Sequence, residues 1–96
     1  MLGLWLLLGA AGPAPIVGRA TVIDGDTISV AKVQIRLWGV DAPEGRQACR
    51  DAAGRSYRCG EAAAARLRTL TAAGPVICIV RDHDTNGRVV SQCRAS

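Results

Sequence analysis

The sequence predicts a small, mainly β domain with one helix. Short apolar and β-branched runs, bounded by Gly, Asp or Asn, are typical of strands. One Ala-rich stretch in residues 60–70 is typical of a helix. A chain of 96 residues has room for a single domain.

The first residues, from Met1 to Ala11, are nearly all apolar, and no charged side chain precedes Arg19. An apolar run of about ten residues is too short to span a bilayer, which needs roughly 20, so we expect no stable membrane anchor. The run fits the apolar part of a secretory signal peptide, although the usual basic residues before it are missing. A mis-assigned start or an apolar tail is the alternative. We therefore assign 1–18 to a signal peptide and linker and 19–96 to the domain, and expect a secreted or periplasmic protein.

Five strands and one helix are expected after the leader. The Asp24-Gly25-Asp26 turn ends the first strand, and Ala31-Lys32 separates the next two. The expected strands are 16–22, 27–30, 33–38, 76–80 and 88–93. Together with a helix between the third and fourth strands, this is the element order of the OB-fold, a five-stranded antiparallel β-barrel.

The expected helix begins at Gly60-Glu61 and ends at Ala73-Gly74-Pro75, where Gly and Pro stop it. Its apolar residues Ala63, Leu67 and Leu70 follow helical spacing and predict one narrow buried face. The polar segment before it, from residue 41 to 60, is expected to be a loop.

The four cysteines are Cys49, Cys59, Cys78 and Cys93. None forms a C-x-x-C pair, which disfavours a zinc site, whereas an even count behind a leader favours two disulfides in an oxidising compartment. A final hairpin centred between Thr85 and Asn86 would place Cys78 directly opposite Cys93, a spacing that suits a disulfide. Cys49 and Cys59 would then bridge the loop, although counting alone leaves the other pairings open.

The net charge is +4, and arginine makes up nearly all of the 12 basic residues. Guanidinium groups bind phosphate oxygens with two donors, and a basic surface attracts polyanions. A composition bias toward Arg, Ala and Gly explains the same charge without any ligand. Charge alone therefore does not establish a nucleic-acid partner.

Three separated motifs carry a family resemblance. They are Asp24-Gly25-Asp26-Thr27, the segment from Arg36 to Glu44 (RLWGVDAPE), and Asn86-Gly87-Arg88. In this order, with a helix between the second and third, they resemble the staphylococcal nuclease (thermonuclease) family over residues 20–94. The resemblance implies the family's OB-fold.

The resemblance also implies a calcium site. Asp26 and Asp41 match the family's metal-binding carboxylates, and Ala42 matches the residue that supplies a backbone carbonyl ligand. Ca²⁺ prefers oxygen ligands of this kind, and three protein ligands leave positions for water and a phosphate oxygen.

The remaining matched residues imply hydrolysis of a phosphodiester. Glu44 matches the carboxylate that activates the attacking water, and Arg36 and Arg88 match the arginines that bind the scissile phosphate. The expected activity is calcium-dependent cleavage of DNA or RNA with little sequence preference, because these residues address phosphate rather than bases. No specific protein partner is implied.

Other interpretations stay open. Family members usually continue into further helices, whereas this chain ends at Ser96, so a non-catalytic nucleic-acid-binding OB-fold or an inactive nuclease fragment is the alternative. A purely structural domain is a third. The segment 82–87 matches the opening of an EF-hand loop, but Cys93 stands where the bidentate Glu belongs and the flanks are strand-like.

Overall fold

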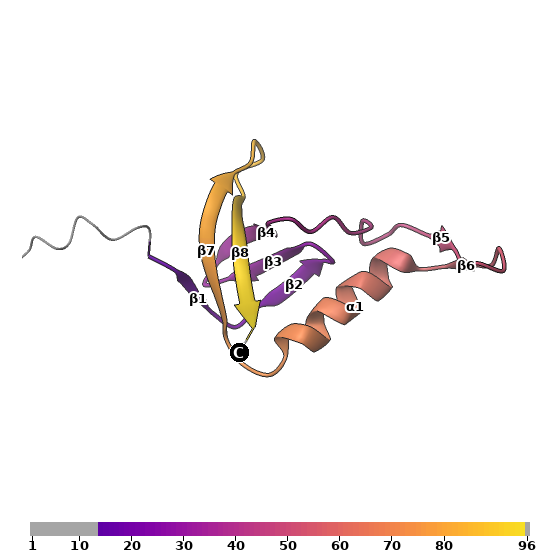
Figure 1. The fold of residues 1–96 in the computed structure, drawn as a ribbon, viewed down its shortest axis with the longest axis horizontal. Helices are drawn as coiled ribbons and strands as arrows, with labels where there is room; N and C mark the ends of the chain where they lie inside the picture. The colour runs from indigo at the N-terminus through magenta and orange to yellow at the C-terminus, as the bar shows by residue number, and fades with distance from the viewer. Residues whose placement is uncertain (1–13, 96) are drawn as a thin grey trace, which may run out of the picture.

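The structure, a computed structural model, describes residues 14–95, so the predicted apolar leader from Met1 to Ala11 lies outside the described residues, whereas residues 16–18 of the expected signal peptide and linker form a strand of the sheet. It contains a six-stranded sheet, a two-stranded hairpin and one helix (Figure 1). The elements are β1 (Ile16–Gly18), β2 (Thr21–Asp24), β3 (Thr27–Val30), β4 (Val33–Leu37), β5 (Cys49–Arg50), β6 (Ser56–Tyr57), α1 (Cys59–Thr71), β7 (Val76–His83) and β8 (Val89–Ala95).

A mainly β fold with one helix is confirmed, whereas the five-stranded antiparallel barrel is not. The large sheet has the order β1-β7-β8-β4-β3-β2 and is open. The expected strand 16–22 is divided at Arg19 and Ala20, and its halves β1 and β2 occupy opposite edges of the sheet. In addition, β4 and β8 pair in parallel. Parallel pairing requires a long crossover connection, which the segment containing α1 and β7 provides.

The core lies between β3, β4 and β7. Its buried side chains are Ile28, Val30, Ile35, Val76 and Cys78. Ile28 pairs directly with Ile35 across β3 and β4, so both project to the same face of the sheet. Each fully buried aliphatic side chain contributes about 1.5–3 kcal/mol to folding. This small core holds the strands whose ends carry the candidate site.

The turn between β3 and β4 consists of Ala31 and Lys32, as predicted. Both have a positive φ, 50° and 66° respectively. Two consecutive residues of this kind form the two-residue hairpin turn whose twist matches that of the flanking strands. The turn sets the register in which Arg36 faces Thr27.

The helix α1 begins within one residue of its predicted start and packs mainly against β2. Ala63 and Leu67 are half-buried and Ala64 is buried, but Leu70 is 51% exposed. The predicted apolar face is therefore wrong at Leu70. Its side chain lines a shallow, mainly apolar hollow of about 270 Å³ between the helix and the end of β8.

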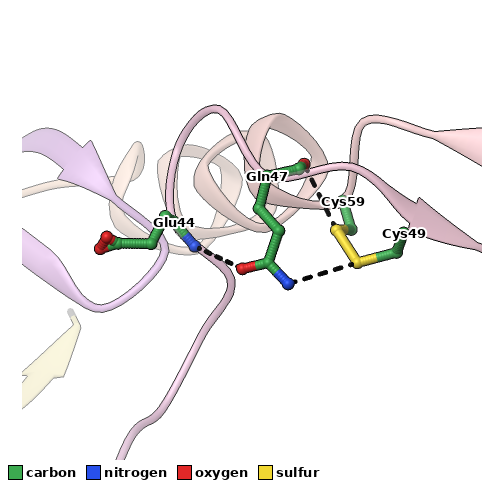
Figure 2. Close-up of a disulfide and its surroundings, with 4 residues drawn as sticks. All are labelled: Glu44, Gln47, Cys49 and Cys59. Carbon is green, nitrogen blue, oxygen red and sulfur yellow. Dashed lines mark hydrogen bonds between the residues drawn. A yellow bond between two sulfur atoms is a disulfide. The ribbon is translucent and has the colours of Figure 1, made fainter.

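Both predicted disulfides are present, Cys49–Cys59, which is drawn in Figure 2, and Cys78–Cys93. Cys78 and Cys93 are direct partners on β7 and β8, as the predicted register required. Near the turn the strands pair one residue differently, and a bulge between Val80 and Asp82 restores the register before the cysteines. The first bridge joins the expected loop, which contains the short β5–β6 hairpin, to the start of α1.

Candidate functional site

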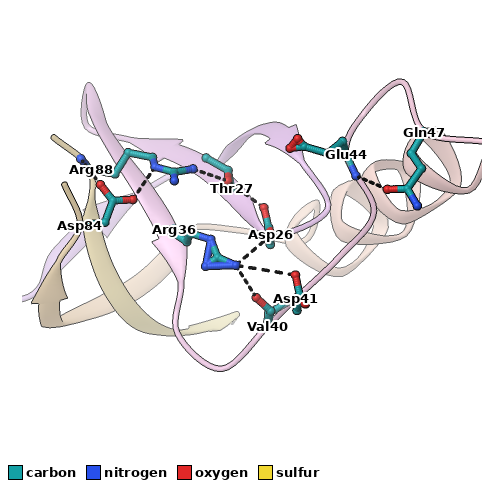
Figure 3. Close-up of polar contacts among 9 residues, drawn as sticks. All are labelled: Asp26, Thr27, Arg36, Val40, Asp41, Glu44, Gln47, Asp84 and Arg88. Carbon is teal, nitrogen blue, oxygen red and sulfur yellow. Dashed lines mark hydrogen bonds and ion pairs between the residues drawn. The ribbon is translucent and has the colours of Figure 1, made fainter. Parts of the chain in front are cut away.

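The candidate site lies where β3, β4 and β8 meet. Thr27 at the start of β3 pairs directly with Arg36 on β4, and Arg36 pairs with Val90 on β8. Arg88 lies just before β8 and Asp26 just before β3. Strand pairing therefore brings three separate parts of the sequence to one place (Figure 3).

Arg36 lies between the two carboxylates predicted to bind metal. Its Nη2 atom is 3.4 Å from Asp26 Oδ2 and 3.9 Å from Asp41 Oδ1. The same nitrogen donates to the backbone carbonyl of Val40 at 3.4 Å. The Asp26 side chain is 15% exposed, whereas that of Asp41 is 98% exposed. In the structure, the guanidinium of Arg36 supplies the positive charge that both carboxylates share.

Arg88 belongs to the same polar network through Thr27. Its Nη1 donates to Thr27 Oγ1 at 3.4 Å, and that hydroxyl donates to Asp26 Oδ1 at 2.9 Å. Thr27 is 1% exposed, so its hydroxyl is held in place by burial. The hydroxyl connects Arg88 to Asp26, the carboxylate that pairs with Arg36. The sequence motif contained Thr27 but assigned it no role. Its position next to Asp26 at a strand start was the available signal.

Asp84 holds Arg88 from the other side, a second role that the sequence did not reveal. Arg88 Nε donates to Asp84 Oδ2 at 2.8 Å, and Asp84 Oδ1 accepts from the backbone N–H groups of Asn86 and Arg88. Partial burial by itself would raise the pKa of Asp84, but these N–H donors and the Arg88 guanidinium outweigh it. The pKa of Asp84 is therefore held below its usual value, and the carboxylate stays charged beside Arg88.

Close packing brings the Asp26 turn against the loop that carries Ala42. A side-chain carbon placed on Gly25 would lie 2.7 Å from Ala63 Cβ on α1 and 2.9 Å from Ala42 Cβ. Only glycine allows this approach. The helix thus holds together the two segments that contain Asp26, Asp41 and Ala42.

Glu44 is placed on the same loop but outside the network. Its side chain is exposed, and within residues 14–95 it makes no hydrogen bond or ion pair with Asp26, Arg36 or Asp41. Its backbone N–H donates to Gln47 Oε1 at 3.2 Å. In Figure 3 the dashed line from Glu44 runs to Gln47, and none joins it to the arginine–carboxylate network.

The donors at the site fit a hard cation in chemical type. Asp26 and Asp41 both lie within 4 Å of one positively charged nitrogen, and Ala42 follows with a carbonyl oxygen. Ca²⁺ takes carboxylate and carbonyl oxygens together with water. No cluster of three or more His, Cys, Asp or Glu side chains suited to a metal occurs in residues 14–95. A metal here would therefore be held by two carboxylates, completed by other oxygens, and Arg36 would have to leave them.

Trp38 lies beside the site at the end of β4. It is 49% exposed, and the Arg81 guanidinium stacks 4.4 Å from the centre of its ring. Its backbone N–H donates to the carbonyl of Ser91 at 2.8 Å. The other tryptophan of the chain is Trp5, outside the described residues, so in a Trp5→Phe background the fluorescence of Trp38 reports on this end of the sheet.

Fold and site together define a small, disulfide-bonded β domain with an arginine–carboxylate network at the strand ends. No family model matches the chain. The chain is 44% identical over 95 residues to the succinoglycan biosynthesis protein ExoI of Rhizobium meliloti (strain 1021). This similarity covers 97% of the chain but 50% of that relative, so the chain spans about half the length of the curated relative it matches.

These comparisons correct the assignment to the thermonuclease family, which is wrong. The similarity found is to a protein named for polysaccharide biosynthesis, and no nuclease family model matches. The three motifs are short, and the structure accounts for parts of them by local packing. Gly25 is required by its contact with α1, and Arg88 forms an ion pair with Asp84 at 2.8 Å.

The two disulfides indicate an environment outside the reducing cytoplasm. Within residues 14–95, no helix has the length and apolar character needed to cross a membrane.

Proposed function

We propose that this domain hydrolyses phosphodiester bonds of DNA or RNA with the help of Ca²⁺. The observation that supports this most directly is the network in which Arg36 and Arg88 are joined through Asp26 and Thr27. Two guanidinium groups held close to two carboxylates provide both of the charges that a metal–phosphate complex requires. The proposal rests on this geometry and not on family membership.

Each residue has a distinct role in the proposed reaction. Asp26, Asp41 and the carbonyl of Ala42 would hold Ca²⁺, which would supply positive charge beside the phosphate. Arg36, 31% exposed in its side chain, turns from the carboxylates to a phosphate oxygen. Arg88 approaches a second oxygen while Asp84 holds its Nε.

Glu44 accepts the proton of the attacking water in this scheme. Its exposed carboxylate is free to approach a substrate bound at the network. A general base at hydrogen-bond distance from water contributes about 10²–10⁴-fold to a rate. The reacting water then attacks the phosphorus, the P–O bond on the opposite side breaks, and the leaving oxygen takes up a proton from solvent.

The open sheet is related to the OB-fold, because β1 and β2 follow one another in the chain yet occupy its two edges. The protein acts in a secreted or periplasmic location, as the two disulfides favour.

A role in polysaccharide biosynthesis is the second candidate, favoured by the 44% identity to the succinoglycan biosynthesis protein. Expression of this chain in a Rhizobium meliloti strain that lacks ExoI tests it. Restored succinoglycan production would support the role, and unchanged production would count against it.

Cleavage of a fluorescently labelled single-stranded oligonucleotide tests the nuclease proposal. We expect Ca²⁺-dependent cleavage that stops with a chelator and falls about 10²–10⁴-fold in Glu44→Gln. Gln34→Ala, an exposed change on β4, serves as the control and keeps full activity. Cleavage that survives both the chelator and Glu44→Gln would refute the proposal. Salt-sensitive binding without cleavage under any divalent cation would instead identify a non-catalytic binding domain.

A further inference from the structure

Glu44 begins a tight turn that is closed by two reciprocal hydrogen bonds, the first of which is drawn in Figure 2. The backbone N–H of Glu44 donates to Gln47 Oε1 at 3.2 Å, and the backbone N–H of Gln47 donates to the Glu44 carbonyl at 2.9 Å. Gln47 therefore fixes both backbone polar groups of Glu44.

The same glutamine is joined to the start of α1. The backbone N–H of Gly60 donates to the Gln47 carbonyl at 3.1 Å, and Cys59 Sγ lies 3.4 Å from that oxygen. The Nε2 of Gln47 lies 3.9 Å from Cys49 Sγ, the other end of the disulfide. The bridge thus has contacts with Gln47 at both of its sulfur atoms.

Gly60 permits the turn to lie directly on the helix. A side-chain carbon at this position would collide with the Glu44 carbonyl oxygen and lie 2.9 Å from the Gly45 carbonyl carbon. Both obstacles are backbone atoms, so no side-chain rotation relieves the collision. The helix start and the backbone of Glu44 therefore occupy one fixed arrangement.

We infer that Gln47 is a positioning residue for Glu44 and that the Cys49–Cys59 bridge is the clamp through which it acts. The inference rests on the proposed function, in which Glu44 is the general base. Since the exposed Glu44 side chain has no partner in the site network, its direction depends on its backbone. A displacement of about 1 Å costs up to about 100-fold in rate.

Four variants of the full chain test this inference. Gln47→Ala removes the acceptor, and Gln47→Glu keeps an oxygen that accepts from the Glu44 N–H. A double Cys49→Ser, Cys59→Ser variant removes the clamp. Gln34→Ala, the same change at an exposed position on β4, is the control.

We expect kcat for oligonucleotide cleavage to fall about 10–100-fold in Gln47→Ala and in the double serine variant. KM and the Ca²⁺ dissociation constant, the latter measured by isothermal titration, should stay within about twofold of the wild type, since only the general base is displaced. Gln47→Glu should recover most of the lost kcat. Hydrogen exchange at the Glu44 amide should become faster in Gln47→Ala and remain unchanged in Gln34→Ala.

Two results would overturn the inference. One is an active wild type whose kcat is unchanged in both Gln47→Ala and the double serine variant. The other is unchanged exchange at the Glu44 amide in Gln47→Ala, which tests the clamp even if the wild type cleaves no substrate. An inactive wild type with faster exchange in the variant would therefore reject the proposed function while supporting the clamp.

Discussion

Replacing Arg36 with glutamine separates two roles that this guanidinium cannot fill at the same time. In the structure it neutralises Asp26 at 3.4 Å and approaches Asp41 at 3.9 Å. In the proposed reaction those carboxylates hold Ca²⁺ and Arg36 binds phosphate. Ca²⁺ must therefore displace Arg36, and removing the arginine should make Ca²⁺ bind more tightly even though catalysis is lost.

The expected change in affinity follows from the exposure of the pairs. The Arg36 side chain is 31% exposed, and its partners Asp26 and Asp41 are 15% and 98% exposed, so solvent screens the pair with Asp41 much more than the pair with Asp26. With the exposed pair contributing little, the loss of both corresponds to about 1 kcal/mol, or a roughly fivefold tighter Ca²⁺ dissociation constant in Arg36→Gln. The cleavage rate should fall about 10²–10³-fold because one phosphate donor is lost.

Isothermal titration of Ca²⁺ at low ionic strength measures the change. Arg50→Gln is the matched control, because it removes the same charge from the β5–β6 hairpin, where Arg50 donates to Gly54. Weaker Ca²⁺ binding in Arg36→Gln, or an effect equal to that of Arg50→Gln, would refute the competition between metal and arginine.

Three further predictions concern stability. Ser91 is fully buried, and its Oγ has no hydrogen-bond partner within residues 14–95. Ser91→Ala should therefore raise the free energy of unfolding, measured by urea denaturation, by about 1 kcal/mol. A lower free energy of unfolding in this variant would show that the hydroxyl has a partner. The double Cys49→Ser, Cys59→Ser variant opens a bridge of sequence separation 10 and should lose about 3 kcal/mol, lowering Tm by more than about 10 °C; a shift of only a degree or two would contradict this. Because the pKa of Asp84 is held below 3.8 in the fold, its contribution is present above that pH and is lost as pH falls through the folded value. Below pH 3.8 the free energy of unfolding should therefore fall less steeply with decreasing pH in Asp84→Asn than in the wild type. Identical slopes in the two proteins would argue against the pairing of Asp84 with Arg88.

Local patterns predicted the helix, most of the strands and the disulfides because these depend on neighbours in sequence, but they missed the break in strand 16–22 and the β5–β6 hairpin in the expected loop. The apolar alternation of β3 and β4 fixed their hairpin, and the opposition of Cys78 and Cys93 followed from hairpin register. The correct prediction of the Cys78–Cys93 pair depended on a β-bulge between Val80 and Asp82, which no sequence pattern indicated. Next to the turn the strands pair as Asp82 with Val90 and His83 with Val89, so the turn is centred on Asn86, half a residue beyond the predicted place, and the extra residue in β7 compensates.

The remaining features depend on contacts between distant segments. The parallel pairing of β4 with β8 and the open sheet follow from how the crossover packs. Thr27 became part of the site only because β3 and β8 place it between Asp26 and Arg88. The ion pairs of Arg36 with Asp26 and Asp41 were also not predicted. The family resemblance assigned the two carboxylates to a metal and the arginine to a phosphate.

The β3–β4 turn offers a practical gain for all of these experiments. Ala31 and Lys32 adopt left-handed backbone angles that cost an L-residue about 1–2 kcal/mol each. Asn-Gly is the pair best suited to such a turn, so Ala31→Asn with Lys32→Gly should give a more stable parent chain. Variants at Gln47, Gly60 or the cysteines that would otherwise unfold could then be purified and assayed in that background.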